Sequence, residues 1–137
     1  MRVSIALKKD MIAIYSHELG INTTEHIKDK DLLGKRYYGM MYAINRAVAH
    51  IKGVLEAEKP DEIIAFEISN RTLVKWFQQE KANDGYEEYF NEVLEELNML
   101  PIRYTFVYSS SVKASKFLDE KSTGTEKLSS LEEMLNA

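Results

Sequence analysis

The sequence predicts an α/β fold in which a mixed β-sheet is flanked by α-helices. Alternating apolar residues near both ends of the chain, at residues 3–7 and 102–108, have the two-residue period of strands. Between them, residues 33–55 place apolar side chains at steps of three and four, which is the period of an amphipathic helix. Strands interleaved with helices favour a layered α/β architecture.

The first three predicted elements are strands. Residues 3–7 and 11–19 have the pattern of a hairpin around a short turn at residues 8–10. A third strand is expected over residues 21–27, after the break at Gly20, because the two threonines there favour extended structure. The long helix over residues 33–55, of about six turns, follows this strand.

The middle of the chain continues with a strand and two helices. The nearly continuous apolar run at residues 63–68 predicts a central strand that is covered on both faces. Ser69 or Asn70 is expected to cap a helix over residues 71–81. Apolar periodicity predicts another helix over residues 86–97.

The chain is expected to end in a strand over residues 102–108 and a short helix over residues 112–118. The predicted order is thus three strands, a helix, a strand, two helices, a strand and a helix. We assign residues 1–120 to one domain and residues 121–137 to a linker and a short amphipathic C-terminal helix. That last helix either folds back on its own domain or docks on a partner.

Composition excludes several classes of protein. The 137 residues fit one domain and include no cysteine, which excludes disulfides and thiolate-bound zinc. No apolar run approaches the roughly 20 residues that a membrane helix needs, so we expect no membrane contact and a cytoplasmic location. The three histidines lack the spacing of a zinc site, and no glycine-rich phosphate loop is present.

Three segments carry a resemblance to the ribonuclease H family, which covers about residues 1–120. Residues 38–47 are similar to the first helix of that family. Residues 66–77 resemble its strand that ends in an acidic residue before a helix, and residues 101–119 resemble its last strand and the helix that follows. The resemblance implies a ribonuclease H-like fold with the element order given above.

The family's catalytic carboxylates are missing from the matching positions. The resemblance places these acids near Ala6, on Gly39, on Ser69 and near residues 113–116, and this chain has no acid there. Cleavage with two metal ions needs clustered oxygen ligands that these residues do not supply. The resemblance therefore implies a catalytically inactive domain that needs no metal or other cofactor.

We expect a binding site where two strands end, because ligands of such sheets lie beyond the carboxyl ends of the parallel strands. The candidate residues are Ser69, Asn70, Arg71, Ser109, Ser110, Ser111, Lys113 and Lys116. Hydroxyls, an amide and cations beside helix N-termini suit a phosphate or another anion. The alternative is that they are helix caps and loop residues, a role that Ser and Asn favour in any fold.

Two further hypotheses concern charged residues. Glu67 lies near the end of the predicted central strand, where a divergent metal-dependent nuclease would use it as a ligand, or where Arg71 or Lys75 would pair with it. The second is a basic and aromatic surface that would grip nucleic acid: Lys28, Lys30, Lys35, Arg36, Tyr37 and Tyr38.

The leading hypothesis for function is an inactive ribonuclease H-like module that binds a protein partner or a nucleic-acid backbone. The formal net charge is −4, of which residues 119–137 contribute −3, so the remaining body carries about −1 and slightly favours a protein partner. A small anionic ligand is a further alternative. The open sheet edge or the apolar tail would also support a homo-oligomer.

Overall fold

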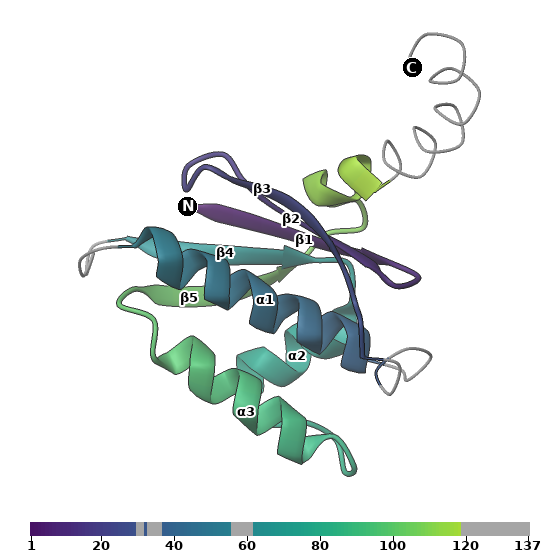
Figure 1. Cartoon of the computed structure of the whole chain (residues 1–137). Coiled ribbons are helices and arrows are strands. Elements are labelled where there is room, and N and C mark those ends of the chain that lie inside the picture. The colour runs from purple at the N-terminus through teal and green to yellow at the C-terminus, as the bar shows by residue number, and fades with distance from the viewer. Residues whose placement is uncertain (30–31, 33–36, 56–61, 119–137) are drawn as a thin grey trace, which may run out of the picture.

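The computed structural model describes residues 1–29, 32, 37–55 and 62–118. Figure 1 shows one open sheet with helices packed on it. The strands are β1 (Arg2–Lys8), β2 (Met11–Ser16), β3 (Ile21–His26), β4 (Ile63–Ile68) and β5 (Arg103–Tyr108). The helices are α1 (Tyr38–Val54), α2 (Arg71–Gln79) and α3 (Glu87–Asn98), and a short helix follows at residues 113–118.

The five strands lie in the order β3-β2-β1-β4-β5. β2 is antiparallel to β1 and β3, whereas β1, β4 and β5 are parallel to one another. The α/β class and the mixed sheet flanked by helices are therefore confirmed. Because β1 and β4 are parallel neighbours, their carboxyl ends meet at the same edge of the sheet.

A two-residue turn of Lys9 and Asp10 joins β1 to β2, and Lys9 has a positive φ of 57°. Asp10 also holds the end of β3, because its carbonyl oxygen accepts a hydrogen bond of 2.6 Å from the Ile27 amide. Its carboxylate lies 3.4 Å from Nδ1 of His26. The predicted turn is confirmed, although β2 ends at Ser16, before the predicted end at residue 19.

Helix α1 begins later than predicted. Tyr37 has a left-handed backbone with φ of 74°, and the helix begins at Tyr38. A left-handed residue cannot continue a right-handed helix, so α1 does not include Tyr37. Residues 33–36, where the prediction begins, lie outside the described residues. Gly39 then lets the first turn approach β1, since a Cβ there would stand 2.9 Å from Cδ2 of Leu7.

Helix α2 has the predicted start and an earlier end. Its N-cap is Asn70, whose Oδ1 accepts a hydrogen bond of 2.9 Å from the Leu73 amide, one of the orphan donors of a helix start. The helix ends where Glu80 takes a left-handed backbone with φ of 56°. The Lys81 amide donates back to the Trp76 carbonyl oxygen, which closes the last turn.

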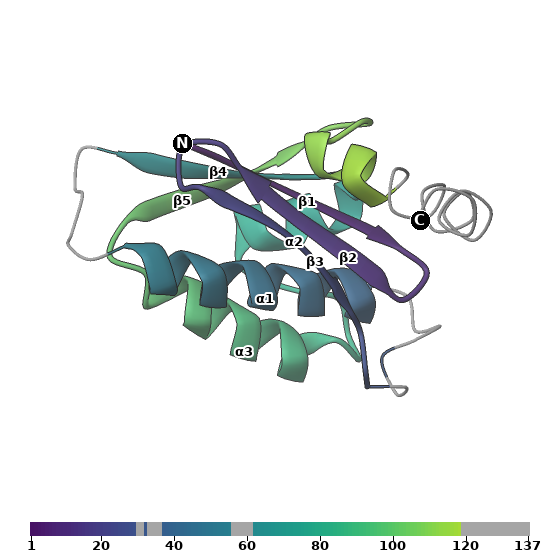
Figure 2. The same cartoon turned by 45° about the horizontal axis from the view of Figure 1, so that its top comes forward.

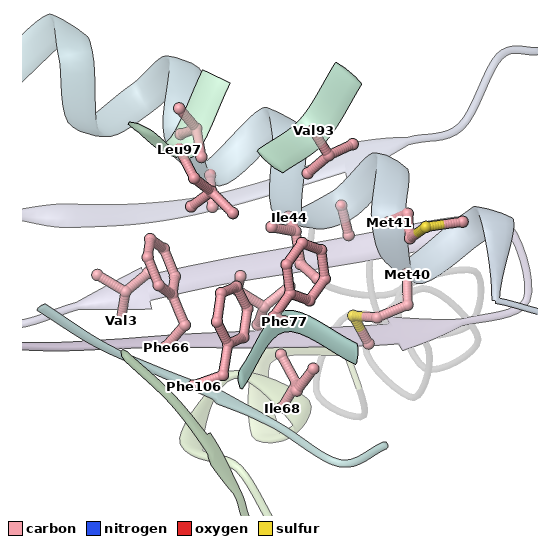
Figure 3. Packing of buried hydrophobic residues seen from close by; sticks show 14 of the residues in the cluster. Val3, Met40, Met41, Ile44, Phe66, Ile68, Phe77, Val93, Leu97 and Phe106 are labelled. Atoms are coloured by element: carbon pink, nitrogen blue, oxygen red, sulfur yellow. The ribbon is translucent and has the colours of Figure 1, made fainter. Parts of the chain in front are cut away.

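The three long helices cover one face of the sheet and enclose the larger core (Figures 1 and 2). Its buried side chains interdigitate between the sheet and the helices, as Figure 3 shows for Val3, Met40, Met41, Ile44, Phe66, Ile68, Phe77, Val93, Leu97 and Phe106. Phe106 stacks on Phe66 and Phe77 with ring centroids 5.0 and 4.4 Å apart, so aromatic packing joins β4, β5 and α2.

The opposite face of the sheet is only partly covered. There the short helix at residues 113–118 packs Ala114 and Leu118 on Ala6 and Ala13, which belong to β1 and β2. On β4, Ile63 is 43% exposed. The prediction that this strand is covered on both faces is therefore wrong within the described residues, and the apolar run reflects one deeply buried face.

None of the helices in the described ranges is long and apolar enough to cross a membrane. The predicted linker and C-terminal helix of residues 121–137, and the predicted domain boundary at residue 120, lie outside the described residues.

Candidate ligand-binding site

A cavity of about 350 Å³ opens where β1 and β4 end, beside the first turn of α1. Its walls come from the carboxyl end of β1, the segment after β4, the start of α1 and the segment around the short helix. The described residues that line it are Ile5, Ala6, Leu7, Lys9, Ile27, Leu32, Tyr37, Gly39, Met40, Ser69, Asn70, Ser110, Val112 and Ser115.

The cavity combines an apolar wall with a small polar group of residues. Its polar lining consists of the Ser69, Ser110 and Ser115 hydroxyls, the Asn70 amide and the Lys9 ammonium. Among the described lining residues none is acidic, and Lys9 carries the charge. Polar and apolar groups contribute about equally to its surface. A concave surface with a few convergent polar groups is the usual form of a small-ligand site.

Three of the predicted site residues line this cavity, namely Ser69, Asn70 and Ser110. Asn70 has a second role, because its Oδ1 already accepts the α2 capping bond. Ser115 belongs to the short helix, where its Oγ donates a hydrogen bond of 2.7 Å to the Val112 carbonyl oxygen. The cavity thus uses groups that also hold the local backbone.

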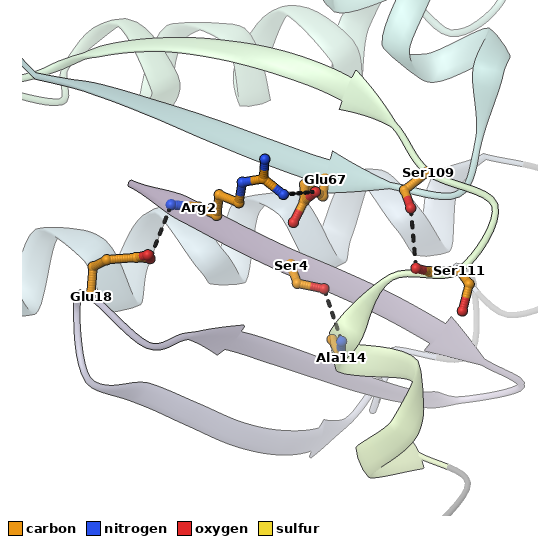
Figure 4. Close-up of polar contacts among 7 residues, drawn as sticks. All are labelled: Arg2, Ser4, Glu18, Glu67, Ser109, Ser111 and Ala114. Carbon is orange, nitrogen blue, oxygen red and sulfur yellow. Dashed lines mark hydrogen bonds and ion pairs between the residues drawn. The ribbon is translucent and has the colours of Figure 1, made fainter.

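The other five predicted residues lie outside the cavity lining. The Arg71 guanidinium stands over the Tyr108 ring, 4.2 Å from its centroid. The Ser109 hydroxyl donates a hydrogen bond of 3.1 Å to the Ser111 carbonyl oxygen (Figure 4). The Arg71–Tyr108 contact and a hydrogen bond of 3.0 Å from the Ser109 amide to the Ile68 carbonyl oxygen hold the ends of β4 and β5 together, which is the cap-and-loop role considered above.

The two predicted lysines sit on the short helix. Lys113 is exposed and borders a small recess on the opposite sheet face, together with Arg2 and Glu67. Lys116 is exposed one turn further along. Neither lines the cavity.

The positions that the ribonuclease H resemblance assigns to catalytic acids come together at the cavity. Ala6 on β1, Gly39 on α1 and Ser69 after β4 all line it, and Ser115 falls within the fourth assigned stretch. Residues far apart in the sequence therefore meet at one place, and none of the four carries a carboxylate. Across the described parts of the chain, no group of three or more His, Asp or Glu side chains is arranged to hold a metal ion.

Glu67 lies away from the cavity, on the opposite face of the sheet. Its Oε2 is 3.3 Å from Nη1 of Arg2 (Figure 4). The pair forms because β1 and β4 are neighbours with Ser4 aligned to Glu67, which brings Arg2 alongside. The structure pairs Glu67 with Arg2, and neither Arg71 nor Lys75, the predicted partners, takes that place.

A second carboxylate binds the backbone at the start of β1. Oε1 of Glu18 accepts a hydrogen bond of 3.1 Å from the Arg2 amide (Figure 4). This bond lowers the pKa of Glu18, so the carboxylate stays ionised to a lower pH than a free glutamate.

The predicted basic and aromatic surface is only partly within the described residues, since Lys30, Lys35 and Arg36 lie outside them. Tyr37 packs against Trp76 with ring centroids 5.0 Å apart. Tyr38 stacks on Tyr89 at 5.8 Å. Both tyrosines are thus part of the aromatic packing between α1, α2 and α3, and Tyr37 also forms a wall of the cavity.

Two polar lining residues were missed from the sequence, namely Lys9 and Ser115. Lys9 belongs to a hairpin turn, and only the pairing of β1 with β4 brings that turn to the same edge as Ser69. Ser115 looks like an ordinary helix residue in the sequence. A search for polar residues at the carboxyl ends of all predicted strands would have found Lys9 but not Ser115.

The chain matches no family model, and comparisons with curated proteins and with solved structures give no match either.

Proposed function

We propose that this chain is a catalytically inactive ribonuclease H-like domain that binds a phosphate-bearing ligand in the cavity at the end of β1 and β4. The observation that carries the proposal is the meeting of Ala6, Gly39, Ser69 and Ser115 around one cavity.

The element order supports the ribonuclease H part of the proposal. Three strands, a helix, a strand, two helices and a strand follow one another, with the short helix after them. The cavity stands beyond the carboxyl ends of parallel strands, where open α/β sheets bind their ligands. One fold hosts many activities, so the activity itself is argued from the cavity.

The polar lining favours a phosphate. The Ser69 and Ser110 hydroxyls, the Asn70 amide and the Lys9 ammonium group provide hydrogen-bond donors, while the Ser115 hydroxyl donates to the Val112 carbonyl oxygen. The described lining adds no carboxylate that would repel an anion. Ser69 and Asn70 also immediately precede α2, whose N-terminal amides favour negative charge.

The apolar wall of the cavity favours a ligand that carries an apolar or ring-shaped group in addition to the phosphate. Leu7, Tyr37 and Met40 give the cavity a surface suited to a sugar or base ring. The volume of about 350 Å³ lies at the lower end of the range for small-ligand sites. A nucleotide unit, free or within a single strand, has the required combination of groups.

Binding without cleavage follows from the side chains at the cavity. Phosphodiester cleavage with two metal ions needs carboxylates that hold both ions and stabilise the charge of the transition state. Ala6 and Gly39 offer no side-chain ligand, and Ser69 offers a neutral hydroxyl. Glu67, the carboxylate of the alternative nuclease hypothesis, is paired with Arg2 on the other face.

The proposal is tested by fluorescence anisotropy with labelled single-stranded DNA, single-stranded RNA and a hybrid duplex at low salt, with and without Mn²⁺. A gel of the same samples detects cleavage. A thermal shift with nucleoside monophosphates and inorganic phosphate separates a free nucleotide from a strand. We expect saturable binding that weakens with salt, and intact nucleic acid on the gel.

The matched variants are Lys9→Ala, in the cavity, and Lys81→Ala, an exposed residue two positions after the end of α2. Loss of one phosphate contact is expected to weaken binding and to lower the salt slope by about 1 for Lys9→Ala only. Equal effects of both variants would contradict a site in the cavity. Cleavage that Glu67→Gln abolishes would establish the nuclease hypothesis instead, and absence of all binding would leave a protein partner as the function to test.

A further inference from the structure

The sheet face opposite α1, α2 and α3 has a part that the described residues leave open. Strand alternation and the pairing of β4 with β5 place three aligned pairs on it: Ile63 with Arg103, Ala65 with Thr105, and Glu67 with Val107. We name these six residues the open β4–β5 face. Ile63 is 43% and Val107 is 40% exposed.

The neighbouring part of the same face is covered. Over β1 and β2, Val112 and the short helix that follows it bury Ala6 and Ala13. Figure 2 shows this helix on the side of the sheet opposite the three long helices. An α/β layer is stable when helices cover the apolar residues of both faces, so a second helix beside the short one would complete the layer.

We propose that the C-terminal segment of this chain, residues 126–137, is that second helix and docks on the open β4–β5 face. Its sequence places Leu128, Leu131 and Leu135 at steps of three and four, which form one stripe on a helix. Their counterparts on the sheet are Ile63 and Val107, with Ala65 between them in space leaving room for larger side chains. The inference does not depend on what the cavity binds.

Residues 119–125 are long enough to connect the end of the short helix to the open β4–β5 face. The described residues end at Leu118, which borders the β1–β2 turn together with Met11. Three strand spacings separate β2 from β5, a distance of about 14 Å. Residues 119–125 can span up to about 23 Å when extended. The apolar stripe can therefore lie along β4 and β5 without strain in the connection.

Charge also favours this occupant. The cations on or beside the open face are Arg2, Arg103, Lys113 and the N-terminal ammonium, and the carboxylates are Glu18, Glu62 and Glu67, which gives a net charge of +1. Residues 119–137 carry five acidic and two basic side chains, a net charge of −3. An acidic helix is thus attracted to this face.

The absence of cysteine from the chain permits a direct test in the full-length protein. One variant carries Val107→Cys with Leu131→Cys, and its control carries Glu95→Cys, on the exposed side of α3, with Leu131→Cys. After mild oxidation at low protein concentration, we expect an intramolecular disulfide in the first variant at a yield several-fold above the control. Equal yields, or disulfides only between molecules, would overturn the proposal.

A second measurement does not require a bond to form. The alkylation rate of the single thiol in Val107→Cys is compared with the rate in the same protein carrying Leu131→Glu. We expect the thiol to react several-fold faster when the apolar stripe is interrupted, and the thiol of Glu95→Cys to react equally in both backgrounds. An unchanged rate at position 107 would overturn the docking.

Discussion

Ser4 on β1 connects the sheet to the short helix through one buried hydrogen bond. Its Oγ accepts from the Ala114 amide at 2.8 Å, and the two residues are 110 positions apart in the sequence. Ser4 is 2% and Ala114 is 0% exposed. The change Ser4→Ala removes the acceptor and leaves a buried amide without this partner, because water cannot replace it there. Such a loss costs about 1–3 kcal/mol of unfolding free energy.

The assay is urea unfolding followed by the fluorescence of Trp76, the one tryptophan, which is 2% exposed in the core. We expect Ser4→Ala to lower the midpoint with an unchanged denaturant slope. It should also weaken ligand binding, because the short helix carries Ser115 of the cavity. Melting should fall by roughly 3 °C for each kcal/mol lost.

Ser16→Ala is the matched control. Ser16 is also buried, at 1% exposure, but its Oγ accepts a longer bond of 3.3 Å from the Leu19 amide, within a local turn. A longer bond between near neighbours contributes less, so the loss should be below about 1 kcal/mol. A Ser4→Ala protein that unfolds like the parent, or that loses no more than Ser16→Ala, would refute the role assigned to this bond.

Three further predictions concern single side chains. Asn70→Ala removes the α2 cap and should cost about 1 kcal/mol in thermal unfolding, whereas Asn70→Ser should retain most of it. Burial raises the pKa of Glu25, but hydrogen bonds from Arg46 and His50 bring it below its usual value. The stabilisation that the ionised Glu25 contributes is complete above the pKa that Glu25 has in the unfolded chain, and it is lost as pH falls through its lower pKa in the folded protein. Below about pH 4.5, the free energy of unfolding should therefore fall more steeply in the parent than in Glu25→Gln. Burial raises the pKa of Tyr89 to about 12, so the stabilisation from its neutral phenol is lost as pH rises from about 10 to 12. Tyr89→Phe should remove one phenol that ionises at high pH from the ultraviolet titration, and it should lessen the loss of unfolding free energy over that range.

Local patterns in the sequence predict the strands well where one face of the strand is buried and the other is exposed to solvent. β5 alternates the exposed Arg103 and Val107 with the buried Phe106, and the structure places the strand within one residue of the predicted range. The apolar residues of β4 follow one another instead, which suggests burial on both sides. Only the structure shows that Ile63 faces outward. Periodicity reports which residues are apolar, not what covers them.

Contacts between distant strands are harder to predict. The sequence predicts a partner for Glu67 from the nearby helix, but the pairing of β1 with β4 brings Arg2 to it. The same pairing brings Lys9 to the cavity. A sequence read without a strand order gives no reason to connect residues 2 or 9 with residues 67–69, because that order depends on packing across the whole sheet.

The candidate site is easier to predict from the sequence than contacts between distant strands, but harder to predict than the strands themselves. The edge of the sheet follows from strand direction, and Ser69, Asn70 and Ser110 line the cavity there. Arg71 is predicted to be there as a cation that suits an anion, yet its guanidinium rests on the Tyr108 ring. Direction of the side chain, not position along the chain, decides whether a residue reaches the cavity.

The most direct measurement is a titration of the ¹⁵N-labelled protein with adenosine monophosphate, followed by amide chemical shifts, with inorganic phosphate and adenosine in parallel. If the cavity binds a nucleotide unit, the amides of Ser69, Asn70, Ser110 and Ser115 shift together and saturate at one dissociation constant, and adenosine alone binds more weakly. Shifts that avoid these amides and gather on the open β4–β5 face, or no shift at high nucleotide concentration, would contradict a phosphate site in the cavity.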